Sequence, residues 1–349
     1  MSKSIEHILF LSPAFPANKN ETWIVTYFYN YIQALSKSYP DIKISIITAG
    51  YPKQKVDYKL DNVNVYSLGI AKYKVLKPFY WKKIIDLAVS INDLQKVSTL
   101  HALWLNECAF LAQFIGTKLN LNSIVTVMGS ELISKNRYLR FIDVKRFLIV
   151  NVSEKMRTLF LQKHNINSHV ITWGIEPKVL PFGILRNIDV LFVGYLNDNK
   201  SPLEFISIIK KMKKSSPNIK AIMIGEEYGN KKINLIIEEN DLNDNIRFLG
   251  RLDNEDVKDY MLRSKVLVHT SKFESQGYVF VEALGAGMHI VSRDVGIAKS
   301  SRKWSIAIDE NDFVKEIGIK LESELGFQSE VLFPICKTVD SYLNLYNSN

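Results

Sequence analysis

The sequence predicts an α/β protein made of two doubly wound domains. Short apolar runs of strand length alternate with longer helical patterns along the whole chain, which is typical of parallel sheets covered by helices. With 349 residues, of which 47% are hydrophobic, the chain can build two cores of ordinary size. The alternation breaks once, at a stretch with two prolines and two glycines, and then begins again. We expect the domain boundary at that break.

The first domain is expected over residues 1–172. Two helical patterns stand out in it, at residues 21–38 and 153–165. The break that follows, ITWGIEPKVLPFGILRN, predicts a linker over residues 173–187. The predicted strands of this domain are HILFLS, KISIIT, VNVYSL, TLHALW, SIVTVM, FLIVNV and HVIT.

The second domain is expected over residues 188–330. Each of its predicted strands is followed by a turn and a helical segment, and the final stretch, residues 331–349, predicts one more helix. In a doubly wound domain the ligand binds at the carboxyl ends of the strands, so the turns after the strands are the places to look for a site. The strands are DVLFVG, AIMIG, IRFLG, KVLVHT and MHIVS.

Composition limits the possible partners and compartments. The net charge of +9 and pI near 9.2 predict a basic surface, but no nucleic-acid-binding motif is present in the sequence. No apolar run approaches the roughly 20 residues that span a bilayer, and the N-terminus does not have the pattern of a signal peptide. Cys108 and Cys336 lack metal-ligand spacing, and we expect both to be reduced and buried in a cytosolic protein.

One local cluster concerns a membrane partner. KYKVLKPFYWKK, residues 72–83, mixes five lysines with aromatic residues. Basic and aromatic residues together suit an anionic lipid interface. A solvated loop with a few packed aromatic residues would explain the same composition, and both interpretations stay open.

The run FESQGYVFVEALGAGMHIVS, residues 273–292, is the most informative segment for function. It places Glu274 and Glu282 eight positions apart across Gly277, which lets the backbone turn before a helix predicted over 278–286. Glu282 lies about one turn into that helix, where it can accept hydrogen bonds from sugar hydroxyls, and Glu274 stays in the loop. Two glutamates at this spacing around a helix start also occur by chance.

The start of the same predicted helix is a candidate anion site. Its first free N–H groups belong to Tyr278 and Val279, and such groups bind phosphate at helix N-termini. The sequence contains no Walker-type phosphate loop and no G-x-S-x-G turn, and no G-x-G-x-x-G follows the first strand. A dinucleotide enzyme is therefore disfavoured despite the doubly wound pattern.

This segment, with VLVHT before it and VSRDVG after it, resembles the E-x7-E signature of retaining glycosyltransferases with the GT-B fold, often called group 1. The resemblance covers nearly the whole chain and is strongest from Gly194 to Gly296. It implies two Rossmann-like domains facing a cleft. The first would bind the acceptor and the second the nucleotide sugar, and the final helix would cross back onto the first domain.

The resemblance also extends to DVLFVGYLNDNKS, residues 189–201. It implies that Gly194 and Lys200 belong to the donor site and that Lys200 is catalytic, together with Glu274. A lysine ammonium suits a diphosphate as a compact charge, although most lysines of such a chain lie on its surface. The family has an arginine where this chain has Tyr195, so Lys200 would neutralise a larger share of the phosphate charge.

Two further loops resemble the family's base-binding region. IRFLGRL, residues 246–252, implies that Arg251 and Leu252 line the pocket of the nucleobase. IGEEYGN, residues 224–230, corresponds to a glycine-containing loop near base and ribose, where Glu226 is either a donor contact or a solvated carboxylate.

The acceptor side is implied by two segments of the first domain. SPAFPANKNETWIV resembles a subset of the family and places Glu21 and Thr22 there, although Thr22 could also simply cap the following helix. VTVMGSEL resembles a strand and turn whose usual wording is His-Gly-x-Asp or Glu. It implies acceptor-side roles for the residues Met128, Gly129 and Glu131. Met128 replaces the family's histidine, and His101, in HALW, is expected to be a packed strand residue.

The resemblance implies metal-independent transfer of a sugar from a nucleoside diphosphate to a hydroxyl, with retention. No D-x-D, the usual metal-binding signature of GT-A glycosyltransferases, occurs in the sequence. The expected acceptor is a glycan or lipid-linked glycan in cell-surface polysaccharide synthesis, such as capsule, exopolysaccharide or O-antigen. The expected location is cytoplasmic or peripheral on the inner face of the membrane. Two alternatives stay open, a nucleotide-sugar 2-epimerase and a binding protein that has lost turnover.

Overall fold

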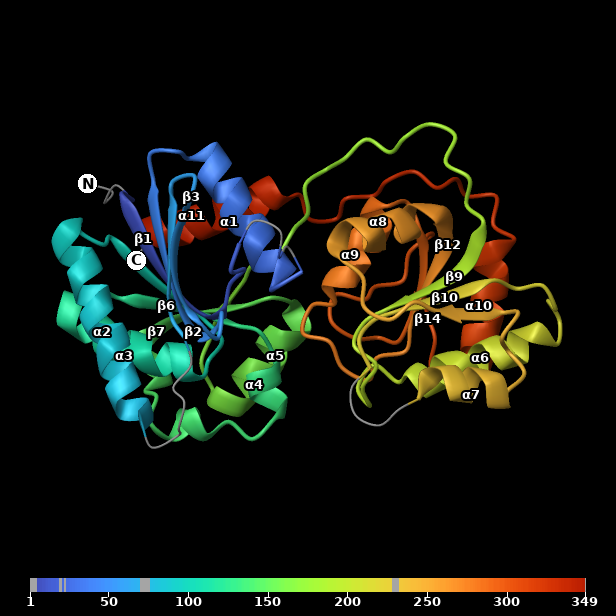
Figure 1. The fold of residues 1–349 in the computed structure, drawn as a ribbon, viewed down its shortest axis with the longest axis horizontal. Helices are drawn as coiled ribbons and strands as arrows, with labels where there is room; N and C mark the ends of the chain where they lie inside the picture. Colours follow the sequence, from blue (N-terminus) through green and yellow to red (C-terminus); the bar gives the residue numbers. More distant parts are fainter. Residues whose placement is uncertain (1–4, 19–20, 22, 70–75, 228–231, 349) are drawn as a thin grey trace. The chain divides into compact units, whose positions relative to one another are not determined.

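The computed structural model describes residues 5–18, 21, 23–69, 76–227 and 232–348 (Figure 1). The chain divides into two compact units. Unit 1 comprises Met1–Gly174 together with Ile335–Asn349, and unit 2 comprises Ile175–Pro334. The first division falls inside the stretch 173–187 that was expected to be a linker, most of which therefore belongs to unit 2.

Unit 1 is built on a sheet whose strand order is β3-β4-β2-β1-β5-β6-β7-β8. Neighbouring strands are parallel, except that β3 and β4 are antiparallel. The seven predicted strands are present, and β3 is an additional edge strand that the apolar runs did not indicate, because its exposed positions are charged or polar. The strands are β1 (His7–Ala14), β2 (Lys43–Tyr51), β3 (Lys55–Leu60), β4 (Val63–Leu68), β5 (Thr99–Leu103), β6 (Ser123–Val127), β7 (Phe147–Asn151) and β8 (His169–Val170).

The helices of unit 1 confirm one predicted boundary and correct another. The predicted helix 153–165 is α5, whose N-cap Ser153 accepts the N–H of Met156. The helix predicted over 21–38 begins only at Thr26, because Val25 has a left-handed φ of 42°; before it, the Ile24 N–H donates to the Glu21 carbonyl at 3.2 Å. The segments are α1 (Thr26–Ser38), α2 (Lys77–Leu94), α3 (Glu107–Leu119), α4 (Ser130–Ile133), α5 (Glu154–His164), α11 (Ile335–Asn347) and the 3-10 turns η2 (Arg137–Arg140) and η3 (Val144–Arg146).

The C-terminal helix α11 packs on the strands of unit 1 through a buried polar network. The Nδ1 of His101 lies 2.7 Å from the Tyr346 hydroxyl and its Nε2 lies 2.8 Å from Thr126 Oγ1. Thr126 Oγ1 is in turn 2.9 Å from the Tyr342 hydroxyl. His101 is fully buried and burial lowers its pKa to about 3, so it is a neutral packed residue.

The two cysteines differ in their environments. Cys108 is buried in α3, as expected, but Cys336 is exposed at the start of α11. The expectation that both are buried was wrong for Cys336. The apolar stripe of α11 that packs inward includes Ile335, Val339 and Leu343, and Cys336 lies beside that stripe.

Unit 2 contains a fully parallel sheet with the order β11-β10-β9-β12-β13-β14. Its five predicted strands are present, and β14 adds an edge. Within the described ranges of the chain, no helix is both long and apolar enough to cross a membrane. The elements are β9 (Ile188–Val193), α6 (Pro202–Lys213), β10 (Ala221–Ile224), α7 (Ile233–Glu239), β11 (Ile246–Phe248), α8 (Asn254–Arg263), β12 (Ser264–His269), α9 (Tyr278–Gly285), β13 (His289–Ser292), β14 (Trp304–Ile306) and α10 (Glu310–Leu321).

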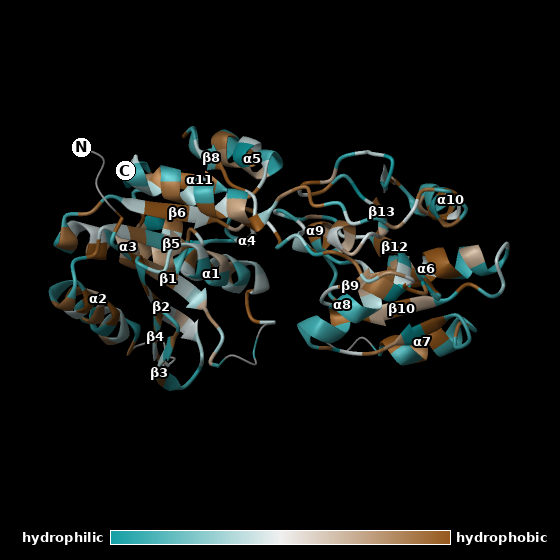
Figure 2. Cartoon of the chain, turned by 90° about the horizontal axis from the view of Figure 1, so that it is seen from above, coloured by the Kyte–Doolittle hydropathy of each residue, from teal (hydrophilic) through white to brown (hydrophobic). Residues whose placement is uncertain are grey.

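Both faces of this second sheet are buried, which explains its continuous apolar strands. Val190 and Phe192 of β9 pack with residues of α6, α7 and α10, whereas Leu191 packs on the opposite face with residues of α8 and α9. Successive side chains of a strand point to opposite faces, so a strand covered on both sides carries no polar alternation. The central strands are accordingly hydrophobic in Figure 2, and the helices carry both kinds of residue.

Candidate functional site

The first feature of the site is a close approach of glycines at the ends of β9 and β10. Gly194 follows β9, and the side chain of Lys200 passes over it. A Cβ at Gly194 would lie 3.4 Å from both Cδ and Cε of Lys200. Gly225 follows β10, with a φ of 154°, and a Cβ there would lie 1.8 Å from the carbonyl oxygen of Gly194. A larger residue at position 225 would therefore displace the turn that presents Lys200.

Lys200, Glu274 and His269 form one charged group. The ammonium nitrogen of Lys200 lies 2.5 Å from Glu274 Oε1, and His269 Nε2 lies 2.8 Å from the same oxygen. The side chain of Glu274 is 12% exposed and that of His269 is 1% exposed. Within the described part of the chain no hydrogen bond reaches the other oxygen, Oε2. Lys200 and His269 thus hold Oε1 of the Glu274 carboxylate, and Oε2 is available to a ligand.

The charge states within this group follow from its contacts. Burial alone would raise the pKa of Glu274, but the adjacent Lys200 ammonium and the hydrogen bond from His269 outweigh it and hold that pKa well below its ordinary value. Burial lowers the pKa of His269, so its ring is neutral near pH 7. The Nε2 of that neutral ring must carry the hydrogen, because an ionised carboxylate can only accept.

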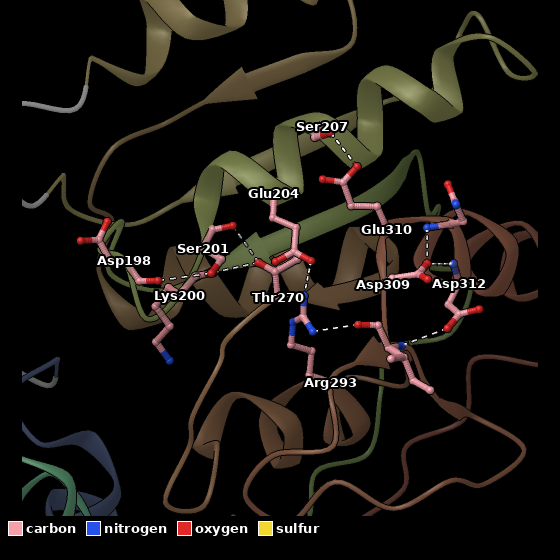
Figure 3. Close-up of polar contacts among 12 residues, drawn as sticks. Asp198, Lys200, Ser201, Glu204, Ser207, Thr270, Arg293, Asp309, Glu310 and Asp312 are labelled. Atoms are coloured by element: carbon pink, nitrogen blue, oxygen red, sulfur yellow. Dashed lines mark hydrogen bonds and ion pairs between the residues drawn. The ribbon is translucent and has the colours of Figure 1, made fainter.

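The loop that contains Glu274 is tied to the loop that contains Lys200. The Lys272 N–H donates to the Asn199 carbonyl at 2.8 Å, and the Asn199 amide donates to the Phe273 carbonyl at 2.9 Å. The Thr270 hydroxyl lies 2.8 Å from the Lys200 carbonyl oxygen (Figure 3). These contacts position the two charged side chains through their backbones, so the geometry does not depend on the ion pair alone.

A second support lies behind the same loop. The backbone of Gly296 packs directly against the loop that contains Glu274 and Gln276. A Cβ at Gly296 would lie 2.2 Å from the carbonyl oxygen of Gln276 and 3.1 Å from the Cβ of Glu274. Its φ is +57°, which a side chain rarely adopts. The next residue, Ile297, donates its N–H to the Gln276 carbonyl at 2.9 Å.

A polar network around Arg293 holds the start of α6, which follows Lys200. Arg293 forms an ion pair with Glu204 in the first turn of α6 and donates to the Ile308 carbonyl at 2.8 Å (Figure 3). Glu310 at the start of α10 accepts a hydrogen bond from Ser207 of α6 at 2.8 Å. The network is structural, and it fixes where the turn before α6 can place Lys200.

The helix start that was predicted to bind an anion is formed as expected. Gly277 is the N-cap of α9 with a φ of 78°, and a Cβ there would lie 2.4 Å from the Phe280 ring. Tyr278 and Val279 are the first residues of the helix. The Phe280 ring also packs edge-on against His269 at 4.7 Å, which connects this helix start to the charged group.

Glu282 lies further along α9, and its carboxylate has no hydrogen-bond or ion-pair partner among the described residues, although its backbone carbonyl accepts the Ala286 N–H. Its side chain is half-buried, and burial raises its pKa to about 7. The two glutamates of the sequence pattern thus differ, because Glu274 is paired with the Lys200 ammonium and hydrogen-bonded to His269, and the side chain of Glu282 has neither kind of contact among the described residues. Because the carboxylate of Glu282 has no partner among the described residues, it can accept hydrogen bonds from a ligand.

The remaining donor-side residues lie in the turns after β9 and β11. Tyr195 is 57% exposed. Arg251 lies 3.5 Å from the Glu226 carboxylate at the surface, and Leu252 is partly buried against the core beside α8. All of them are at the carboxyl ends of parallel strands, where the doubly wound pattern places ligands.

In unit 1, Glu131 is enclosed rather than open. It is 5% exposed, and its Oε1 accepts the N–H of Leu105 at 3.1 Å and that of Met128 at 2.8 Å. Burial raises its pKa despite these hydrogen bonds. Glu131 therefore joins the ends of β5 and β6 and holds the Met128–Gly129 turn, and Met128 itself is 8% exposed.

The other predicted acceptor-side segment is only partly described. Glu21 accepts hydrogen bonds from the Ala17 N–H and the Tyr51 hydroxyl, both at 2.9 Å. The second contact links Glu21 to the end of β2. Thr22, predicted beside it, lies outside the described residues.

Sequence reasoning missed His269, Asn199, Thr270 and Gly296 as parts of the site. The signal for His269 was a polar residue that ends an otherwise apolar strand, VLVHT, directly before the glutamate loop. In the described ranges no group of three or more His, Cys, Asp or Glu residues could hold a metal ion. The expectation of metal-independent transfer remains a prediction.

Comparisons with known proteins concern the sequence family and the fold. Residues 184–303 match the family model of glycosyl transferases group 1. The chain is 29% identical over 111 residues to the phosphatidylinositol N-acetylglucosaminyltransferase gpi3 subunit of Schizosaccharomyces pombe, a match that covers 31% of this chain and 24% of that protein. It is 27% identical over 271 residues to a human phosphatidylinositol N-acetylglucosaminyltransferase subunit, covering 73% of this chain and 56% of that protein. The matches thus span about a quarter and just over half of these two relatives.

Among solved structures, Anabaena HepE in complex with UDP-glucose superimposes with a TM-score of 0.70. The match has 15% sequence identity and covers 98% of this chain and all of that one. This likeness concerns the fold. Residues 184–303 thus carry the sequence pattern of the group 1 glycosyl transferases, and the two parallel-sheet units have the architecture of the GT-B fold.

Proposed function

We propose that this protein transfers a sugar from a nucleoside diphosphate sugar to a hydroxyl of a glycan or lipid-linked acceptor, with retention of anomeric configuration. The observation that carries the proposal is the group formed by Lys200, Glu274 and the start of α9. It combines a partly buried cation, a carboxylate with one free oxygen and a helix N-terminus at the carboxyl ends of parallel strands. Those features suit a diphosphate with a sugar attached to it.

In this proposal Lys200 and the N–H groups of Tyr278 and Val279 stabilise the charge that develops on the leaving diphosphate. The bond between the anomeric carbon and the phosphate oxygen breaks, and the acceptor oxygen forms the new bond on the same face. The leaving phosphate oxygen takes the acceptor's proton. No side chain has to act as the base in this scheme, so the protein contributes position and electrostatics.

The two glutamates would bind different parts of the donor. The free Oε2 of Glu274 would accept hydrogen bonds from hydroxyls of the transferred sugar, and Glu282 would accept those of the ribose. Arg251 and Leu252 would border the base. With Tyr195 where the family has an arginine, Lys200 is the principal cation for the phosphates, and metal-independent transfer depends on it.

The acceptor is proposed to bind through unit 1. Met128, Gly129 and the loop held by Glu21 would contact it, and Glu131 would act by fixing the turn at Met128. A lipid-linked acceptor agrees with the names of the two relatives, both of which are phosphatidylinositol N-acetylglucosaminyltransferase components. A role in assembling capsule, exopolysaccharide or lipopolysaccharide is the more specific form of the proposal.

A second candidate is a binding protein that has lost turnover. Tyr195 and Met128, which replace an arginine and a histidine of the family pattern, favour it. The two candidates share donor binding and differ in catalysis, so product formation separates them. A 2-epimerase would instead convert the nucleotide sugar with no acceptor present.

The donor site can be tested by thermal shift with UDP, GDP, ADP and dTDP on the wild type and on Glu282→Ala. A ligand at 100 times its dissociation constant adds about 2.7 kcal/mol, which moves the melting temperature by several degrees. We expect one diphosphate to stabilise the wild type and to stabilise the variant clearly less. If no diphosphate stabilises the wild type at millimolar concentration, the donor site is refuted. An equal shift in the variant would refute the ribose role of Glu282.

A further inference from the structure

Unit 1 carries a cluster of aromatic side chains that three separate segments bring together. Trp81 of α2 lies 4.8 Å from Phe110 of α3, ring centroid to ring centroid, and 6.4 Å from Tyr138 of η2. Phe114 lies 5.0 Å from Phe110. Phe141 is joined to α3 through its carbonyl, which accepts the Gln113 amide at 2.8 Å. We call Trp81, Phe110, Phe114, Tyr138 and Phe141 the aromatic surface.

The polar atoms of this surface are already satisfied by one carboxylate. Glu107 accepts the Trp81 indole N–H at 2.5 Å and the Tyr138 hydroxyl at 2.9 Å, and it forms an ion pair with Lys77 at 2.8 Å. The Lys77 ammonium also contacts the Tyr138 hydroxyl at 2.9 Å. Because these groups bind one another, the aromatic surface needs no water to complete their hydrogen bonds.

Its ring carbons are nevertheless left open. Phe141 is 66% exposed and Phe114 is 44% exposed. Phe79 and Leu76 at the start of α2 are also exposed, but they lie on the side of the helix away from Trp81 and do not belong to this surface. Single exposed apolar residues are ordinary, but several on contiguous elements mark a contact surface.

The same segments hold most of the chain's excess positive charge. Residues 76–83, 107–118 and 135–146 contain nine lysines and arginines against two acidic residues, a net charge of +7 compared with +9 for the whole chain. Of the two acidic side chains, Glu107 is enclosed by its partners and Asp143 caps η3. Asp143 is itself exposed, and Lys82 is paired with Asp86 one turn further along α2, whereas Arg137 and Arg140 are exposed in η2 beside the rings of Tyr138 and Phe141.

We propose that the aromatic surface of unit 1 docks on an anionic lipid bilayer. The exposed rings of Phe114 and Phe141 would enter the interface between headgroups and acyl chains, and the surrounding lysines and arginines would bind anionic headgroups. The positive charge of this surface favours an anionic bilayer over a second copy of the chain, because two copies would bring like charges together. Of the basic and aromatic run 72–83, Trp81 belongs to this surface, and Lys77 contacts its Tyr138. Residues 77–83 belong to α2, so the alternative of a solvated loop does not hold for them.

The test is sedimentation of the full chain with two kinds of vesicles. One kind is phosphatidylcholine alone and the other is phosphatidylcholine mixed with phosphatidylglycerol. We expect binding to the mixed vesicles at least tenfold stronger, and weakening as salt is added. Equal binding to both kinds, or binding to neither, would overturn the proposal.

Two double variants locate the contact. Phe114→Ser with Phe141→Ser should lower vesicle binding at least tenfold, and Arg137→Gln with Arg140→Gln should lower it and flatten its dependence on salt. Val179→Ser with Phe182→Ser is the matched control, since those side chains of unit 2 are fully exposed. The control should bind like the wild type, and if the phenylalanine pair also binds like the wild type, the surface is wrongly assigned.

Three further measurements distinguish lipid docking from unfolding, self-association and nucleic-acid binding. The melting temperature of each variant, and its shift with the stabilising nucleoside diphosphate, should match the wild type, so loss of vesicle binding can be told apart from loss of fold or of donor binding. A dimer in the ultracentrifuge that the phenylalanine pair dissociates would assign the surface to a second copy. Tighter binding to single-stranded oligonucleotides than to mixed vesicles would assign it to nucleic acid. Either result would overturn the proposal.

Discussion

Two buried glutamates, one in each unit, are held in opposite ways. Glu131 of unit 1 is surrounded by backbone N–H groups, and burial still raises its pKa. Glu274 of unit 2 is contacted by Lys200 and His269, and its pKa is lowered. Backbone N–H groups also favour the ionised form, but at Glu131 they do not outweigh burial, whereas the full charge of Lys200 and the hydrogen bond from His269 outweigh it at Glu274.

The difference indicates that one glutamate has a structural role and the other a role in ligand binding. Glu131 uses Oε1 to join the ends of two strands, so its removal should affect folding. Glu274 leaves Oε2 open and shares Oε1 with a lysine that is itself suited to a diphosphate. We infer that Lys200 exchanges Glu274 for phosphate when the donor binds, and that His269 then keeps the carboxylate in place. Each of the following variants tests one side of this comparison.

The largest effect is expected for Lys200→Ala. It removes the cation proposed to stabilise the leaving diphosphate, and loss of one such preorganised group costs about 10²–10³ in rate. The fold should persist, because backbone hydrogen bonds independently hold the two loops. Sugar transfer would be measured at saturating donor, with melting temperature as the check on folding.

The matched control for that variant is Lys272→Ala, which removes the same charge from an exposed position in the neighbouring loop. Turnover there should stay near that of the wild type. Near-normal turnover in Lys200→Ala would refute the catalytic assignment, whatever the control shows.

An intermediate effect, on stability, is expected at Glu131. Glu131→Ala leaves two buried N–H groups without an acceptor, at about 1–3 kcal/mol for each unsatisfied group. Glu131→Gln keeps an oxygen acceptor and should lose much less. The folded pKa of Glu131 is raised, so its ionisation costs stability as pH increases from the unfolded pKa through the folded one, and the Gln variant should lack that loss.

Chemical denaturation of the two Glu131 variants at several pH values measures this difference. The same amide substitution at position 274 should fail in function although it preserves shape, because Lys200 and the sugar need the charge. If Glu274→Gln transfers sugar normally while Glu131→Gln unfolds, the comparison is reversed.

The smallest effect is expected for His269→Gln. The glutamine amide can donate a hydrogen bond to Glu274 much as Nε2 does, so binding of the nucleotide sugar should fall only a few-fold. His269→Phe keeps a ring but cannot donate, and it should weaken binding of the nucleotide sugar more than that of the nucleoside diphosphate. Titration calorimetry with both ligands provides the ratio, and equal losses for the two would show a merely structural role.

Much of the fold was predictable because it depends on local pattern. Apolar runs of strand length indicated every strand of unit 2 except the edge strand β14, and Gly277 indicated the turn before α9. The start of α1 was predicted too early, since the left-handed backbone of Val25 has no sequence signature. The burial of Glu131 and the exposure of Cys336 were equally invisible, because both depend on what packs against them.

By itself, then, the sequence determined two parallel-sheet units, the glycine turn and the spacing of Glu274 and Glu282, because short-range sterics and hydrogen bonding decide them. Only the tertiary structure decided that Lys200 and His269 share one oxygen of Glu274. That meeting requires β9 and β12 to be neighbours in the sheet, so that the turns after them converge. The aromatic surface likewise exists only because α2, α3 and η2 pack together, and such contacts between distant segments depend on the packing of the whole unit.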